Sequence, residues 1–210
     1  MKLLKSPFIV GYSLVLVLGI LLLLSHDKIP LQLQTNALHL DAMDATMPYI
    51  TWLGDGLFAL ALGLVFLLFV HRKLGWWLLI VYGFSAILAQ IAKRALFPDA
   101  MRPYYYLQHH PDFYAIPDFL YYEFHSFPSG HTTTAFALAT VLSLHYAGKF
   151  WIQILCLFLA CLVGFSRTYL SQHFLIDVLA GSLLGTLCGV ALVAFWPSKW
   201  TIHDKPYGIK

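Results

Sequence analysis

The chain has 210 residues, of which 60% are hydrophobic and 11% are charged, and its formal net charge is +3. A soluble domain of this length carries roughly 25% charged residues, so this composition excludes an ordinary soluble fold. The sequence also lacks a basic patch of the kind that binds nucleic acid, so we expect no nucleic-acid partner.

The first expected membrane helix covers residues 7–25, because a bilayer is crossed by about 20 mostly apolar residues. Lys2 and Lys5 precede this segment, as they would in a signal peptide. The apolar run is too long for a signal peptide, however, and no small-residue cleavage site follows it. We therefore expect a retained membrane anchor.

Five further apolar segments follow, each bracketed by charged residues or by Gly and Pro: 54–70, 76–92, 131–148, 150–166 and 174–196. The very short connections at 71–73 and at Lys149 predict antiparallel helical hairpins. The expected fold class is therefore all-α. It is a six-transmembrane-helix bundle that forms a single integral-membrane domain over residues 1–210, with both termini on one side of the bilayer.

The basic residues predict the orientation of this bundle. The side that holds the termini carries Lys2, Lys5, Arg72, Lys73, Lys149, Lys199, Lys205 and Lys210. The opposite side carries Lys28, Lys93, Arg94, Arg102 and Arg167. Basic residues that flank membrane helices favour the cytoplasm, so we expect cytoplasmic termini.

Several residue groups have plain structural interpretations. Cys156, Cys161 and Cys188 lie inside expected helices without metal-ligand spacing, so we expect them to pack as small apolar residues. Asp41 and Asp44 fit the solvated face of an interfacial helix, and Asp55 fits a turn at a helix start.

Residues 104–127 are dense in Tyr and Phe and also contain His109, His110 and His125. They fit an aromatic belt at the membrane interface. The alternative is a lid on the bilayer that gates the access of a lipid headgroup. The His109–His110 pair has no third ligand at a convincing spacing, which argues against a metal site.

Three polar clusters fall on the same face of the expected bundle, at 93–103, 128–131 and 166–177. In the third cluster, His173 and Asp177 are four residues apart and share one helix face. An aspartate that binds one ring nitrogen of a histidine leaves the other nitrogen free as a nucleophile or base. A buried His–Asp pair without chemistry is the alternative, but Arg167 nearby indicates an anionic ligand.

The other two clusters supply further anion-binding groups. Ser129 is a good N-cap for a helix that starts at Gly130 or His131, and the free N–H groups of such a helix end bind anions. Lys93, Arg94 and Arg102 add positive charge. Several cations and two histidines at one membrane face are typical of a phosphate site, where one histidine can attack and the other can protonate the leaving oxygen.

These clusters resemble the signature motifs of the type-2 phosphatidic acid phosphatase superfamily, a family of lipid phosphate phosphatases. The second motif is similar to "PSGH" (128–131). The third is similar to "SRTYLSQHFLID" (166–177), in which Ser166-Arg167, His173 and Asp177 match without a gap. The family's six-helix layout is also similar to the one expected here.

The resemblance implies a role for each matching residue. His173 would attack phosphorus and form a phosphohistidine, and Asp177 would orient it. His131 would protonate the leaving oxygen and then activate water. The phosphate oxygens would be held by Lys93, Arg102, Ser129, Gly130 and Arg167. The resemblance also implies that no metal is required, and we expect no cofactor.

The first motif departs from the family pattern of a lysine, six residues and then Arg-Pro. Here eight residues separate Lys93 from Arg102-Pro103, and seven separate Arg94 from it. Pro98 lies within the added length and must end or kink the helix. We expect Lys93 to be the phosphate ligand, with Arg94 as the rival.

The expected function is hydrolysis of a lipid phosphate or pyrophosphate at the outer membrane face, which is the periplasmic face of the inner membrane in a bacterium. Candidate substrates are undecaprenyl pyrophosphate, phosphatidylglycerol phosphate, phosphatidic acid and lipid A phosphates. Vanadium-dependent haloperoxidases share the anion site by resemblance but are soluble. A non-catalytic lipid-binding or transport protein is the remaining alternative, although binding alone needs neither histidine.

Overall fold

Helices make up most of the part of the chain that the computed structural model describes, residues 5–195, and this part contains no β-strand. The all-α prediction is therefore confirmed. The expected orientation residues Lys2, Lys199, Lys205 and Lys210 lie outside the described residues.

The first half of the chain forms α1 (Pro7–Ser25), α2 (Lys28–Asn36), α3 (Asp41–Ile50), η2 (Thr51–Gly54), α4 (Gly56–Val65), η3 (Phe66–Val70), α5 (Arg72–Ile91) and η4 (Ala92–Leu96). The second half forms α6 (Pro103–Leu107), α7 (Gly130–His145), α8 (Phe150–Tyr169) and α9 (Leu175–Phe195). The bounds of α1 match the sequence prediction, and α8 and α9 lie within three residues of theirs.

The expected number of six membrane helices is not reached. Within residues 5–195, four helices are long and apolar enough to cross a bilayer: α1, Arg72–Leu96, α8 and α9. A fifth crossing arises only if Asp41–Gly54 and Gly56–Val70, which meet at a bend of 58°, are taken together. The expected helix 131–148 is α7, which has only 16 residues because Ser129 caps its start and the chain turns at Tyr146.

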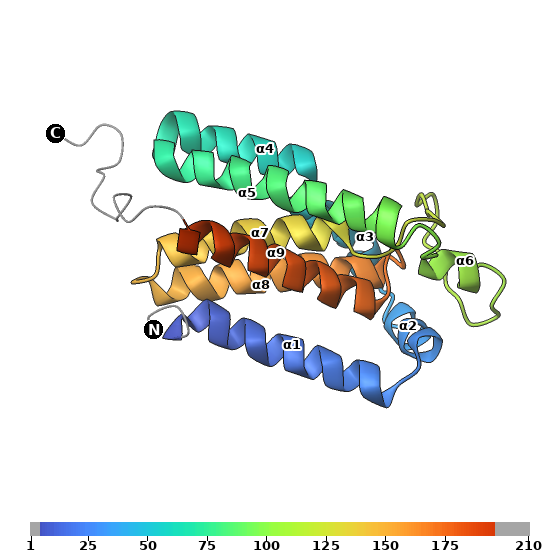
Figure 1. The fold of residues 1–210 in the computed structure, drawn as a ribbon. Helices are drawn as coiled ribbons and strands as arrows, with labels where there is room; N and C mark the ends of the chain where they lie inside the picture. Colours follow the sequence, from blue (N-terminus) through green and yellow to red (C-terminus); the bar gives the residue numbers. More distant parts are fainter. Residues whose placement is uncertain (1–4, 196–210) are drawn as a thin grey trace.

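The short helix α7 lies at the centre of the bundle, between α5 and the α8–α9 pair (Figure 1). Its contact with α9 is close because three glycines of α9 face its backbone. A Cβ at Gly181 would overlap the carbonyl of Ser129, and one at Gly185 would overlap the carbonyl of Thr133. Small residues at four-residue spacing allow helix backbones to approach each other in this way. This contact fixes the start of α7 against the start of α9.

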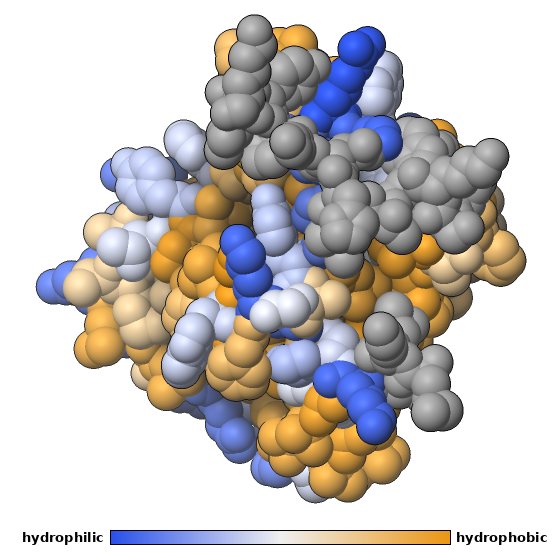
Figure 2. Space-filling view, turned by 90° about the vertical axis from the view of Figure 1, so that its left-hand side faces the viewer, coloured by the Kyte–Doolittle hydropathy of each residue, from blue (hydrophilic) through white to orange (hydrophobic). Residues whose placement is uncertain are grey.

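The two ends of the bundle differ in their connections. At one end, α2, α3 and α6 lie beside the starts of α7 and α9 (Figure 1). At the other end α1 begins and α9 ends, Arg72 and Lys73 begin α5, and Lys149 directly precedes α8. Figure 2 views this second end and shows hydrophilic residues among hydrophobic ones. The helix sides expose large apolar residues such as Leu14 and Trp151, as expected of a surface in contact with lipid.

Candidate active site

The three polar clusters meet in one cavity of about 300 Å³ at the end of the bundle that carries α2, α3 and α6. Its walls come from η4, the segment before α7, the first turn of α7, the end of α8 and the loop between α8 and α9. The lining residues are Gln90, Lys93, Arg94, Arg102, Tyr122, His125, Gly130, His131, Arg167 and His173. Residues up to 83 positions apart in sequence therefore face the same space.

His173 lies in the short loop between α8 and α9, two residues before α9 begins, so the expectation that it shares a face of that helix with Asp177 is wrong. The loop bends so that the backbone N–H of His173 donates to the carbonyl of Arg167. The side chain is 1% exposed. Its Nδ1 lies 3.5 Å from Oδ2 of Asp177 and 3.4 Å from Oγ of Ser126. Its Nε2 lies 3.5 Å from Nη1 of Arg102, on the cavity side. The ring therefore directs Nδ1 toward buried oxygen atoms and Nε2 toward the cations.

Asp177 is held in place by two hydrogen bonds. Its Oδ2 accepts from Oγ of Ser126 at 2.5 Å and from the backbone N–H of Phe174 at 2.9 Å. Ser126 is itself 1% exposed and touches both His173 and Asp177. Ser126 was not predicted, because it lies 47 positions from His173 in a loop without periodicity.

The surroundings of His173 favour its neutral form. Burial lowers the pKa of this histidine well below its ordinary value, and the positive charges of Arg102, Arg167 and Lys93 lower it further. Desolvation and nearby like charges both destabilise an imidazolium ion. A lone pair on Nε2 is consequently available at neutral pH.

His131 occupies the first turn of α7 and lines the same cavity. Its Nε2 lies 3.8 Å from Oδ2 of Asp55. The other carboxylate oxygen of Asp55 accepts from the N–H of Leu57 at 2.8 Å and so caps α4. The expected place of Asp55 in a turn at a helix start is confirmed, but its position beside His131 was not predicted, because the two residues are 76 positions apart.

Ser129 does not line the cavity, unlike its neighbours Gly130 and His131. Its side chain is fully buried, with Oγ 2.8 Å from Oγ1 of Thr132, and it caps α7 through the N–H of Thr132. Its own N–H donates to the carbonyl of Asp177. Ser129 therefore joins the starts of α7 and α9, and the expected contact of its hydroxyl with an anion is not supported by this geometry.

Two of the cations bind the loop that precedes α7. Lys93 is 7% exposed, and its Nζ donates to the carbonyls of His125 at 2.7 Å and Ser126 at 3.4 Å. Arg102 donates from Nε to the carbonyl of Phe124 and from Nη1 to the carbonyl and side-chain oxygens of Gln172. Both side chains are thus fixed at the cavity wall.

The other two cations differ in exposure. Arg94 lines the cavity but is exposed, whereas its neighbour Lys93 is buried. Arg167 is 6% exposed and donates from Nη1 to Oγ1 of Thr51 at 3.0 Å. Its buried Nε has no hydrogen-bond partner among the described residues. A buried donor without a partner indicates a missing acceptor.

The cavity carries a net positive charge. Within residues 5–195, no carboxylate lies within ion-pair distance of Lys93, Arg102 or Arg167. Uncompensated buried cations are costly, so an anionic ligand would complete the site. A phosphate group has both the charge and the acceptor oxygens for these donors.

The aromatic segment 104–127 is anchored to neighbouring helices. Tyr114 pairs through its backbone with the side chain of Asn36 in α2, and its hydroxyl donates to Asp44 in α3. Tyr122 reaches the cavity, where its ring lies 5.5 Å from the guanidinium of Arg102.

The remaining histidines of this segment have different surroundings. His125 contacts the site through its carbonyl. The ring of His110 accepts from the N–H of Asp112, and neither His109 nor His110 lines the cavity.

Comparisons with known proteins give three consistent similarities. The PAP2 superfamily matches residues 74–201. Phosphatidylglycerophosphatase B of Bacillus subtilis is 30% identical over 167 residues, which cover 74% of this chain and 70% of that protein. The structure of a transmembrane PAP2-type phosphatidylglycerolphosphate phosphatase from Bacillus subtilis superposes with a TM-score of 0.66 and 26% identity, over 90% of this chain and 95% of the other.

A shorter similarity is to the lipid A 1-phosphatase of Porphyromonas gingivalis, with 38% identity over 80 residues. These residues cover 38% of this chain and 18% of that longer protein. The chain therefore spans a minor part of one relative and about two thirds of another. The membrane-spanning helices and the membrane-bound relatives together identify an integral membrane protein.

Proposed function

Because the chain belongs to the PAP2 superfamily, we propose that it is an integral-membrane phosphatase that hydrolyses a lipid phosphate or pyrophosphate. One observation carries the proposal: two histidines face a cavity whose buried cations have no carboxylate partner among residues 5–195. Binding an anion requires the cations alone. Transfer of a phosphoryl group also requires a nucleophile and a proton donor, and the two histidines can supply these.

In the first step, Nε2 of His173 attacks phosphorus. A P–N bond forms and the bond from phosphorus to the lipid oxygen breaks. His131, which the negative charge of the bound phosphate holds in its protonated form, gives its proton to that oxygen. The products are a phosphohistidine and a lipid alcohol, or a lipid monophosphate if the substrate is a pyrophosphate. Asp177 and Ser126 keep Nδ1 of His173 protonated and hold the ring in place, as a carboxylate does in a hydrolytic triad.

In the second step, neutral His131 takes a proton from water and the resulting hydroxide attacks the phosphohistidine. The P–N bond breaks, inorganic phosphate leaves, and both histidines return to their starting states. The positive charge that stabilises the phosphoryl oxygens comes from Lys93, Arg102 and Arg167, together with the free N–H groups at the start of α7. We expect turnover without a metal ion.

The proposed membrane arrangement keeps six crossings, with α4–η3 crossing at the outer side of the bundle and α7 crossing at its centre. Both termini then lie on the cytoplasmic side and the cavity lies at the outer face, which in a bacterium is the periplasmic face of the inner membrane. Lys5, Arg72, Lys73 and Lys149 at the opposite end support this orientation. A substrate already anchored in the bilayer reaches such a cavity directly.

The experiment that tests this function measures phosphate release by the purified chain in detergent with EDTA. The panel contains undecaprenyl pyrophosphate, phosphatidylglycerol phosphate, phosphatidic acid and a lipid A phosphate. We expect release from at least one of them, and the ranking identifies the substrate. Saturable phosphate binding without release from any of them would instead favour a lipid-binding protein.

The rate should remain high in mildly acidic solution. The pKa of His173 is lowered by burial and by Arg102, Arg167 and Lys93, so the ring stays unprotonated until well below pH 6.5. The acidic limb of kcat/KM, which reports the free enzyme, should therefore lie below about 6.5, the ordinary histidine value. Removing one cation in Arg102→Gln should move this limb to higher pH.

Ionisation of the substrate affects the pH profiles of wild type and Arg102→Gln equally, so it does not contribute to the difference between them. The measurement is kcat/KM from pH 4 to 9 with one lipid substrate. Coincident acidic limbs for the two proteins would contradict the electrostatic account of His173.

His131→Ala should affect substrates according to their leaving group. A general acid contributes about 10²–10⁴-fold when the leaving oxygen is basic. We expect a loss of that size in kcat/KM on a lipid phosphate, whose leaving group is an alkoxide, and a much smaller loss in kcat/KM on p-nitrophenyl phosphate. This constant reports formation of the phosphohistidine, in which His131 acts as the acid, and not its later hydrolysis. His110→Ala, outside the cavity, should leave both rates unchanged. Equal losses on both substrates would refute the role of His131 as the acid.

A further inference from the structure

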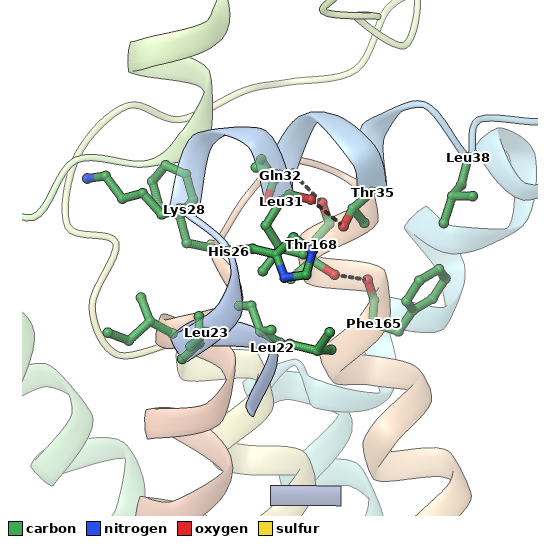
Figure 3. A pocket seen from close by; sticks show the side chains of 13 residues that line it. Leu22, Leu23, His26, Lys28, Leu31, Gln32, Thr35, Leu38, Phe165 and Thr168 are labelled. Carbon is green, nitrogen blue, oxygen red and sulfur yellow. Dashed lines mark hydrogen bonds between the residues drawn. The ribbon is translucent and has the colours of Figure 1, made fainter. Parts of the chain in front are cut away.

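A second cavity, of about 370 Å³, lies between the end of α1, α2, the end of α8 and the start of α9 (Figure 3). Leu22 and Leu23 of α1 lie on one side of it, and Leu31 and Gln32 of α2 lie on the other. A hollow of about 290 Å³ continues from it along α1 toward the middle of the bundle, between Val15 and Leu179. We call these two spaces together the α1 crevice.

The α1 crevice exists because α1 packs loosely at its C-terminal end. In Figure 1, α1 runs close to α8 at its start and diverges toward its end. At Gly19 α1 still contacts α9, because an added Cβ there would meet the side chain of Leu179. Beyond this point α2 closes the gap, because Nε2 of Gln32 donates to the carbonyl of Thr168 at 2.8 Å.

The walls of the α1 crevice are mostly apolar, and the part beside α2 also includes His26, Lys28, Gln32 and Thr35. The residues shared by its two parts are Leu22, Phe165, Thr168 and Leu175, and the Thr168 hydroxyl donates within α8 to the carbonyl of Phe165. Water gains no hydrogen bonds from an apolar wall. If the space were empty, the side chains that line it would lose van der Waals contacts. A hydrocarbon chain is the occupant that the bilayer supplies.

The end of the α1 crevice at the membrane surface carries positive charge. Nζ of Lys28 lies 4.5 Å from the ring centroid of Tyr106 and 5.1 Å from that of Phe174. In the described part of the chain, no carboxylate forms an ion pair with this amine. In Figure 3 the Lys28 side chain lies at one edge of the lining residues with its amine pointing outward, and the His26 ring lies among them. An apolar crevice that ends at an unpaired cation matches a lipid with an anionic headgroup.

We propose that the α1 crevice binds one acyl chain of an anionic phospholipid, with the lipid phosphate at Lys28. This site is separate from the phosphate cavity, since the two share no lining residue. Thr168 and Phe174 of its wall directly follow Arg167 and His173 in sequence, so a bound lipid supports the backbone that carries both. The proposal concerns binding and does not depend on the proposed reaction.

The test counts retained lipids by native mass spectrometry of the full chain, with dioleoylphosphatidylglycerol or dioleoylphosphatidylcholine added at equal concentration. Inorganic phosphate is present in excess to fill the phosphate cavity. We expect one phosphatidylglycerol retained per chain in preference to phosphatidylcholine. Lys28→Gln should weaken phosphatidylglycerol binding about fivefold, the effect of one basic residue near a membrane surface.

A second variant fills the space. Leu22→Trp should abolish retention, whereas Leu21→Trp, on a 55% exposed position of the same helix outside the crevice, should not. Lys149→Gln is the matched charge control, because Lys149 also lies over a tyrosine ring but at the opposite end of the bundle. Circular dichroism melting checks that each variant is folded.

Three results would overturn the proposal: equal retention of the two lipids by wild type, unchanged retention in both Lys28→Gln and Leu22→Trp, or loss of the lipid on adding inorganic phosphate. The last result would place the lipid in the phosphate cavity. None of these results depends on phosphatase turnover. The lipid site can therefore be confirmed in a chain without phosphatase activity, and it can be refuted in a chain that is an active phosphatase.

Discussion

Replacing His173 with asparagine should abolish phosphatase activity while leaving the protein folded. Loss of a nucleophile that acts with its partners as a unit costs about 10⁴–10⁶-fold in kcat. Asparagine retains a polar side chain that can pair with Ser126 and Asp177, so the buried site keeps its hydrogen bonds. The measurement is kcat on the best lipid substrate, together with the thermal unfolding midpoint.

The matched control is His109→Asn, the same exchange outside the phosphate cavity. We expect wild-type kcat for this variant. A His173→Asn protein that unfolds at the wild-type temperature and keeps more than a trace of wild-type turnover would refute the assignment of His173 as nucleophile.

The second large effect is expected for Arg167→Lys, although charge is conserved. The buried guanidinium uses Nη1 to bind Thr51 and leaves Nε available to a ligand, an arrangement that a lysine ammonium cannot reproduce. Loss of one preorganised donor to a transition-state oxygen costs about 10²–10³-fold in kcat. We therefore expect a loss of this order in the rate of phosphate release.

Arg72→Lys serves as the control, since Arg72 begins α5 at the opposite end of the bundle. Its kinetic constants should equal those of wild type. If Arg167→Lys raised KM without lowering kcat, the guanidinium would bind the ground state and the transition state equally, and its proposed catalytic role would be wrong.

Much of the fold was predictable because the signals are local. The bounds of α1 follow from an uninterrupted apolar run, and the capping roles of Ser129 and Asp55 follow from residue type and position. The proximity of His173 and Asp177 follows from a spacing of four residues. Successive membrane helices run in opposite directions, so every second connection lies at the same end of the bundle. This rule was enough to predict that Lys93, Arg102 and Arg167 lie at the same end as His173 and Asp177.

The features that were not predicted depend on contacts between distant segments. Ser126 reaches His173 from a loop, Asp55 lies beside His131 after a bend between η2 and α4, and Thr51 meets Arg167 across 116 positions. Hydropathy also placed the end of α7 at residue 148, three residues too late. The helix ends at His145, although the next residues, Tyr146 and Ala147, are still apolar.

The role of the aromatic segment 104–127 remains a prediction in two forms. Its ties to Asn36 and Asp44 fit a fixed interfacial belt, whereas the contact of Tyr122 with Arg102 at the cavity fits a cover over the headgroup. The two forms differ in how a deletion of residues 109–123 would act. A lid would alter the preference among lipid substrates more than basal activity.

The most direct test of the account is to trap the phosphoenzyme. Wild type and His173→Asn are mixed with lipid substrate labelled with ³²P in the phosphoryl group, quenched in alkali within milliseconds, and digested for peptide mapping. The account predicts an alkali-stable, acid-labile label on the wild-type peptide that contains His173, and none on the variant. Turnover by wild type without any labelled peptide, or a label on another residue, would contradict it.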